Sequence, residues 1–181
     1  MGKTGIETLE LRTLRVEDES SFRDAVDEFS RVTPPWEFAF DFDASINFSD
    51  YVRQREGQSR GVGVREDFVP NTFLVGVVGG VVVGRVSLRH SLNDFLAKVG
   101  GHIGYGVVPS QRRRGYATAM LQLAIPVCRS LGIGRALIIC DEGNVGSRKV
   151  IETCGGVFER LIECPEPGVP KRRYWIDTGT R

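Results

Sequence analysis

The segment from Val107 to Ala117 constrains the fold most strongly, because it joins a β-type run to a helix through a turn rich in arginine and glycine. Residues 101–108 before it have the composition of a strand, and residues 118–131 after it carry apolar side chains at helical spacing. The turn therefore lies at a helix N-terminus, where backbone N–H groups have no partner within the helix and the dipole is positive. Such a turn can bind phosphate through the main chain.

The rest of the chain predicts a mixed α/β fold in one domain over residues 1–181. Alternating or β-branched runs predict strands, and apolar spacing of about 3.6 residues predicts helices. The expected strands cover residues 9–16, 72–78, 81–89, 99–108, 135–140, 157–164 and 171–178, and the expected helices cover 21–32, 49–59 and 118–131. The sheet is expected to be mostly antiparallel, with one parallel pair formed by the crossover from 99–108 through the helix to 135–140.

Charge and composition exclude several function classes. The net charge is +1, with 24 basic and 23 acidic residues, so no global field favours nucleic acid or an anionic membrane. A phosphate loop is therefore favoured over a nucleic-acid patch for the local run Arg112–Arg114, which has no interleaved aromatic residues. No apolar run reaches the ~20 residues of a membrane helix. The four scattered cysteines are expected to be reduced, and the protein is expected to be cytoplasmic.

The spacing Arg112-x-x-Gly115-x-Ala117 resembles the acyl-CoA-binding signature of the GNAT superfamily of N-acetyltransferases. The segment from Asn144 to Phe158 resembles the helix of that family that begins with Asn-x-x-Ala/Ser and closes on a glycine turn. The likeness covers roughly residues 99–160. It implies the GNAT fold, in which the parallel strand pair splays apart, acetyl-CoA as co-substrate without a metal, and an amine acceptor that is a small molecule or a peptide. A homodimer through the closing strands is also possible.

The resemblance implies where the cofactor binds. Its pantetheine arm would add as a strand to residues 104–108, and a bulge near Val107 and Val108 would free a backbone N–H to polarise the thioester carbonyl. Asn144 would bind the cofactor or serve as an ordinary helix cap. The implied cofactor contacts are Val107, Val108, Arg112, Arg113, Arg114, Gly115, Tyr116, Ala117, Thr118, Asn144 and Ser147.

Direct attack by the amine requires a base for its proton and an acid for the departing thiolate. His102 is a candidate base, because its reference pKa is ~6.5; the alternative is a histidine bonded for structure or binding substrate. Many family members use a tyrosine as the acid, but the matching position here falls near Ile151, which cannot donate a proton. Tyr174, Ser147 or water are the remaining candidates.

The acceptor site is less constrained. Arg89, His90 and Asn93 form a polar cluster near Asp94 that either shapes the acceptor pocket or is a solvated turn. The aromatic residues between Trp36 and Phe42 either line that pocket or pack the helices on the sheet. The sequence thus predicts an N-acetyltransferase acting on a primary amine. The alternatives are a catalytically silent acyl-CoA-binding module and a nucleic-acid-binding protein.

Overall fold

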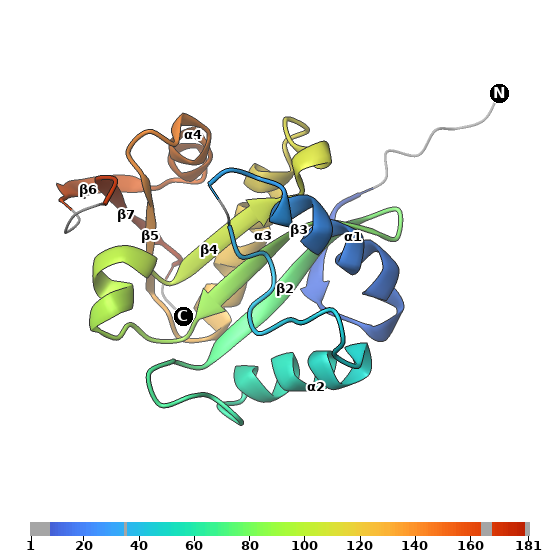
Figure 1. The fold of residues 1–181 in the computed structure, drawn as a ribbon. Coiled ribbons are helices and arrows are strands. Elements are labelled where there is room, and N and C mark those ends of the chain that lie inside the picture. The colour runs from blue at the N-terminus through green and yellow to red at the C-terminus, as the bar shows by residue number, and fades with distance from the viewer. Residues whose placement is uncertain (1–7, 35, 164–167, 180–181) are drawn as a thin grey trace.

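The computed structural model describes residues 8–34, 36–163 and 168–179, and these form a seven-stranded sheet in the order β1-β2-β3-β4-β5-β7-β6 (Figure 1). Every neighbouring pair is antiparallel except β4 and β5, which are parallel. The mostly antiparallel mixed sheet is therefore confirmed. The strands are β1 Glu10–Thr13, β2 Asn71–Val78, β3 Val81–Arg89, β4 Ile103–Val107, β5 Arg135–Asp141, β6 Val157–Ile162 and β7 Lys171–Asp177.

Helices cover both faces of the sheet. Helices α1 (Glu19–Ser30) and α2 (Phe48–Ser59) lie on one face, and α3 (Tyr116–Ser130) and α4 (Val145–Thr153) lie on the other (Figure 1). Two separate apolar clusters result, because successive side chains of a strand point to opposite faces. The cluster under α1 and α2 includes Phe22, Phe29, Tyr51, Phe73 and Val75, and the cluster under α3 and α4 includes Val86, Leu88, Met120, Leu121 and Ile138.

Strands β4 and β5 touch and then diverge. They pair at Ile103 and Ile138, and no further pair between them follows in the described part of the chain. Figure 1 shows the two strands opening away from each other toward the end where β5 leads to α4. The backbone edge of β4 beyond Ile103 therefore faces a gap rather than a neighbouring strand, as the resemblance implied.

Two local predictions about β4 are wrong. The predicted strand 99–108 begins four residues late, because Leu96–Gly100 forms a π-helical turn in which the Asn93 side chain accepts the N–H of Leu96 at 2.9 Å. The predicted bulge near Val107 and Val108 is absent. The register with β3 is regular from Ile103 to Val107, and Val108 donates its N–H to Val83 at 2.9 Å. Pro109 ends the strand by starting a short 3₁₀ turn. The chain therefore leaves the sheet without the extra residue that a bulge would insert.

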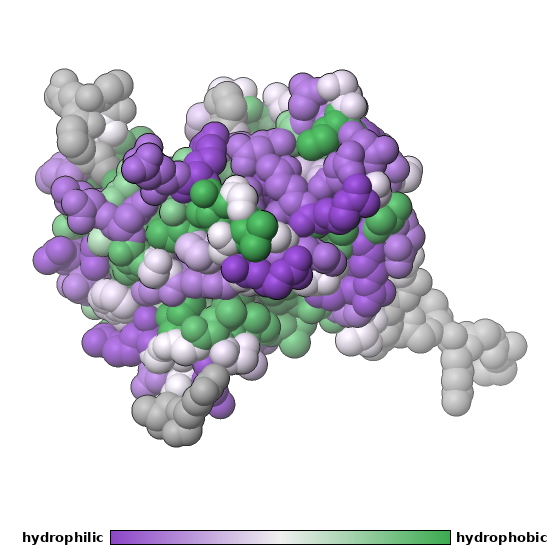
Figure 2. All heavy atoms as spheres, turned by 90° about the horizontal axis from the view of Figure 1, so that it is seen from below, coloured by the Kyte–Doolittle hydropathy of each residue, from purple (hydrophilic) through white to green (hydrophobic). Residues whose placement is uncertain are grey.

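On the face shown in Figure 2, hydrophobic residues form patches between hydrophilic ones. Edge strand β6 exposes Val157, Phe158 and Leu161, and the possible dimer through the closing strands stays a prediction. Within the described residues, no helix is both long and apolar enough to cross a membrane. Cys128, Cys140 and Cys154 are free thiols, and Cys164 lies outside the described residues.

Candidate functional site

The turn after β4 is built to present main-chain donors. Arg113 and Gly115 both adopt positive φ, at 63° and 82°, and α3 begins at Tyr116. The first bond of the helical ladder runs from the Ala119 N–H to the Gly115 carbonyl at 3.1 Å. The N–H groups of residues 116–118 therefore precede the ladder and point out of the helix end, where a helix binds anions.

Side chains around this turn leave the anion site open. Glu28 of α1 accepts hydrogen bonds from both the N–H and the hydroxyl of Ser110, at 2.9 and 2.8 Å, which fixes the start of the turn. Arg112, Arg113 and Arg114 are exposed, and none of them forms an ion pair with another described residue. Three exposed arginines therefore directly precede a helix N-terminus, and one of them, Arg112, donates its Nε to the Val107 carbonyl at 3.3 Å.

The edge of β4 supplies a second set of main-chain groups. The hydrogen bonds from Arg89 N–H to His102 C=O and from Val108 N–H to Val83 C=O show which residues face β3. By the alternation of an antiparallel ladder, Tyr105 and Val107 direct their backbone groups the other way, into the gap toward β5. The sequence prediction assigned the free N–H to Val107 or Val108. The N–H of Val108 is already bonded to β3, so Val107 keeps this role as a proposal.

The start of α4 lies beside the same gap. The side-chain oxygen of Asn144 accepts the N–H of Ser147 at 3.0 Å, so Asn144 caps the helix as one alternative expected. The Ser147 hydroxyl lies 2.8 Å from the hydroxyl of Tyr105 on β4. Burial raises the pKa of Tyr105 well above its usual range. Sequence reasoning missed this hydroxyl pair, whose one local signal is a tyrosine flanked by glycines on the strand that faces the gap.

His102 joins β4 to β5. The ring Nδ1 of His102 accepts the backbone N–H of Leu137 at 2.9 Å. The backbone N–H of His102 donates to the Leu137 carbonyl at 2.7 Å. A backbone N–H can only donate, so the neutral ring carries its proton on Nε2 and has no unoccupied lone pair. Burial, together with the nearby Arg89 cation, lowers the pKa of His102. The geometry therefore favours the structural alternative for this residue over the role of base.

This structural role predicts a pH-dependent stability. Because the folded-state pKa of His102 lies below the unfolded value, unfolding takes up a proton and the protein loses stability as the pH falls below about 6.5. The difference in the free energy of unfolding between wild type and His102→Gln should therefore shrink from pH 7.5 to pH 5.5 in urea titrations. His90 is present in both proteins and cancels. A pH-independent difference would contradict this account.

Tyr174 is also held for structure. Its ring is fully buried on β7, and its hydroxyl donates to Glu152 of α4 at 3.0 Å. Burial and this carboxylate raise the pKa of the Tyr174 hydroxyl. The hydrogen bond ties α4 to the sheet. The role of proton donor proposed for Tyr174 from the sequence thus gains no geometric support, whereas Ser147 lies at the gap.

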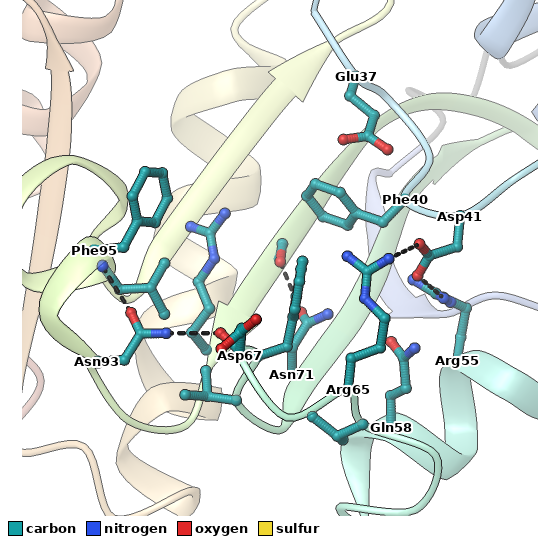
Figure 3. Close-up of a pocket in the computed structure, with 16 residues that line it drawn as sticks. Glu37, Phe40, Asp41, Arg55, Gln58, Arg65, Asp67, Asn71, Asn93 and Phe95 are labelled. Atoms are coloured by element: carbon teal, nitrogen blue, oxygen red, sulfur yellow. Dashed lines mark hydrogen bonds and ion pairs between the residues drawn. The ribbon is translucent and has the colours of Figure 1, made fainter.

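A pocket of about 460 Å³ opens on the sheet face that carries α1 and α2 (Figure 3). Arg89 and Asn93 line it, as the sequence predicted, but His90 is not among its lining residues and instead has Nε2 2.8 Å from the Thr72 hydroxyl. Both ends of the Asn93 amide are used: Nδ2 donates to the Asp67 carbonyl at 3.0 Å, and Oδ1 accepts from Leu96. Asn93 therefore holds two loops of the pocket wall together.

The aromatic residues between Trp36 and Phe42 divide between the two expected roles, core packing and pocket lining. Phe38 is buried and stacks on Phe29, and Phe42 packs edge-on against Phe22, so these rings form core. Phe40 lines the pocket. The ring of Trp36 lies over Gly106 of β4, where an added Cβ would approach it to 2.5 Å.

Several pocket residues were not predicted from the sequence. Figure 3 shows Asp41, Arg55 and Arg65 on one side of the pocket and Asn93 and Phe95 on the other. A single local signal existed, the polar residues Arg85, Ser87 and Arg89 at alternate positions of an otherwise apolar strand. The lining residues missed are Glu37, Asp41, Arg55, Gln58, Val64, Arg65, Asp67, Phe68, Val69, Asn71, Ser87, Phe95 and Leu96.

Comparisons with known proteins agree with this geometry. The family model described as an acetyltransferase (GNAT) domain matches residues 8–157. No curated protein sequence matches the chain. Among solved structures, RimJ from Mycobacterium smegmatis in complex with CoA-disulfide is 20% identical with a TM-score of 0.70, over 95% of this chain and 83% of RimJ. The protein yncA from Salmonella typhimurium, solved with acetyl-CoA, is 14% identical with a TM-score of 0.63, over 96% and 95% of the two chains.

Proposed function

This chain belongs to the family of GNAT acetyltransferase domains, and on that premise we propose that it transfers the acetyl group of acetyl-CoA to a primary amine by direct attack on the thioester. One observation carries the proposal: the unpaired edge of β4 and the N-terminus of α3 border the same gap. A cofactor with a pyrophosphate and an amide-bearing arm needs both features, because phosphate binds at helix ends and an extended amide chain adds to a strand edge.

The proposed binding mode uses groups already in position. The N–H groups of residues 116–118 and the three arginines before them would hold the pyrophosphate, with the Thr118 hydroxyl beside them. The backbone of Tyr105 and Val107 would pair with the pantetheine arm. Asn144 keeps its amide N–H groups for the cofactor while its oxygen caps α4.

Catalysis would rest on proximity and on proton handling. A backbone N–H of the β4 edge would stabilise the oxyanion formed when the amine attacks the thioester carbonyl. The linked hydroxyls of Ser147 and Tyr105 at the gap would protonate the departing thiolate. The exposed carboxylates of Glu37 and Asp67 line the acceptor pocket and would take up the proton of the amine.

A catalytically silent acyl-CoA-binding module is the second candidate. The observation that favours it is Ile151, a fully buried residue at the position where many family members place a tyrosine acid. This module would bind acetyl-CoA as well as an enzyme does but would not turn it over. The two candidates therefore agree on binding and differ in the release of free CoA in the presence of an amine.

Calorimetry with acetyl-CoA tests the shared part of both candidates, with desulfo-CoA and ATP as controls. Binding of both CoA compounds in preference to ATP supports the cofactor site, and amine-dependent release of thiol then separates enzyme from module. No heat with either CoA compound, from folded protein free of copurified ligand, overturns the proposal. Salt-sensitive binding to DNA or RNA instead would indicate that the run Arg112–Arg114 binds nucleic acid.

A further inference from the structure

Arg89 is a cation that faces the acceptor pocket without a counter-charge. It lies at the end of β3 and lines the pocket. Its Nη1 donates to the carbonyls of Gly100 and Gly101, at 3.2 and 3.5 Å, which fixes the plane of the guanidinium. Among the residues that the structure describes, no carboxylate pairs with it and nothing accepts from its Nε or Nη2. That edge of the guanidinium is a two-pronged donor fork.

Strand β4 lets this guanidinium lie directly against its backbone. Ser87 and Arg89 point to the same face of β3, and the strand beside them carries Gly104 and Gly106 on that face. An added Cβ at Gly104 would lie 3.0 Å from Nη1 and 3.3 Å from Nη2 of Arg89. The guanidinium therefore lies against Gly104, one residue (~3.3 Å along the strand) from Tyr105, whose backbone faces the cofactor gap.

Other groups on the pocket floor are donors as well. Ser87 is fully buried and donates its hydroxyl to the Asn71 side-chain oxygen at 2.7 Å. This leaves the amide N–H groups of Asn71 at the pocket wall as donors. Arg55, buried at 4% exposure, has Nε and Nη1 without any acceptor in the described chain. The pocket thus offers N–H donors on Arg89, Asn71 and Arg55 from which no described residue accepts a hydrogen bond.

The carboxylates of the pocket do not cancel this charge at the floor. Asp41 is already flanked by two arginines, Arg55 at 3.3 Å and Arg65 at 3.6 Å. Glu37 and Asp67 are exposed at the rim, and Figure 3 shows Glu37 beyond Phe40 at the pocket's edge. A polyamine, which carries several positive charges and no anion, would meet an uncompensated arginine in this pocket.

The geometry points to an acceptor of the amino-acid class, a small amine whose carboxylate binds the Nε/Nη2 edge of Arg89 while its amine reaches the cofactor gap at Tyr105. This inference rests on the proposed acetyl transfer and adds the chemistry of the acceptor. A planar carboxylate matches the donor fork with two parallel hydrogen bonds. A peptide N-terminus has an amide in place of that carboxylate, which offers the fork a single oxygen and no negative charge.

The pocket walls indicate an apolar side chain on this acceptor. Phe40, Phe68 and Phe95 line the cavity together with Val64, Val69 and Leu96. Phe68 and Phe95 are 55% and 66% exposed, which is high for aromatic side chains unless a ligand covers them. Phenylalanine, leucine and methionine are therefore the probes of choice.

The test compares each of these amino acids with its own amide and with its decarboxylated amine, using wild-type protein and acetyl-CoA. We expect kcat/KM for the acid to exceed that for the amide by about 10- to 100-fold, because the amide loses charge-assisted hydrogen bonds. Arg89→Gln should bring the ratio close to one. Arg53→Gln, which removes an exposed arginine of α2 that does not line the pocket, should keep the ratio.

Each result has a defined meaning. Amides or spermidine used as well as the acids would overturn the carboxylate subsite and leave acetyl transfer intact. If the protein binds acetyl-CoA but acetylates none of these amines, calorimetry with N-acetylphenylalanine and its amide decides, and equal or absent binding of the two overturns the subsite. Failure to bind acetyl-CoA overturns the proposed function itself. Acetyl-CoA binding by Arg89→Gln verifies that this variant is folded.

Discussion

Gly115→Glu should abolish measurable binding of acetyl-CoA, with a loss of affinity of at least about 100-fold, or ~2.7 kcal/mol. Gly115 is the residue before α3, and no other atom lies within 4 Å of the position of an added Cβ. The new side chain is therefore accommodated, but it places a carboxylate where the pyrophosphate needs main-chain N–H groups. The like charges repel, and the side chain fills the space above residues 116–118.

The positive φ of Gly115 must be separated from this effect. A non-glycine residue in that conformation costs about 1–2 kcal/mol, so some loss of stability is expected whatever the side chain. Gly132→Glu is the matched control, because Gly132 has a φ of 80°, an equally open Cβ position and a place at the other end of α3. Calorimetry should show normal acetyl-CoA binding by Gly132→Glu and by Gly115→Ala. Full binding by Gly115→Glu would mean that phosphate binds elsewhere.

Gly101→Ala should destabilise the protein by about 3 kcal/mol or more and damage the junction from which β4 and β5 diverge. Gly101 has a φ of 68° and a ψ of −178°, a region that is almost restricted to glycine. An added Cβ would approach the Leu137 carbonyl oxygen to 2.6 Å. That oxygen cannot withdraw freely, because it accepts the N–H of His102 at 2.7 Å.

Gly80→Ala provides the comparison for this variant. Gly80 has a φ of 79°, but nothing lies within 4 Å of an added Cβ, so its cost is the backbone strain of about 1 kcal/mol. Urea unfolding of both variants measures the difference in the free energy of unfolding. Acetyl-CoA binding should weaken in Gly101→Ala and remain normal in Gly80→Ala. Equal stability of the two variants would show that the β4–β5 junction tolerates a methyl group at position 101.

The features predicted well from the sequence are those set by neighbours in the chain. The hairpin at Gly79 and Gly80 was predicted from a turn signal between two β-branched runs, and the turn between β4 and α3 from arginine and glycine before an amphipathic helix. Phosphate binding at that turn stays a prediction. Local signals also misled. Val99 suggested an early start for β4, but the capped π-helical turn over Leu96–Gly100 includes it. The resemblance to the GNAT fold suggested a bulge near Val107 and Val108, but the register of β4 with β3 is regular there.

The roles of individual side chains depended on contacts between distant segments. His102 and Tyr174 are candidates for proton transfer by residue type, and the N–H of Leu137 and the carboxylate of Glu152 commit them to holding elements together. The hydroxyls of Tyr105 and Ser147 meet only because α4 packs beside the β4 edge. The spacing of residues along the sequence does not predict such pairs, because hydrogen bonding between segments far apart in the chain depends on the completed fold.

The sequence by itself determined the family, the order of the elements and the turn before α3, because strand and helix patterns and a helix N-terminus are properties of short segments. The tertiary structure decided the pocket that we propose for the acceptor, which gathers residues from the α1–α2 connection, α2, the α2–β2 loop, β2, β3 and the β3–β4 connection. The charge that Arg89 presents there depends on which carboxylates lie near it. That is a question of distance in space, which the order of residues does not specify.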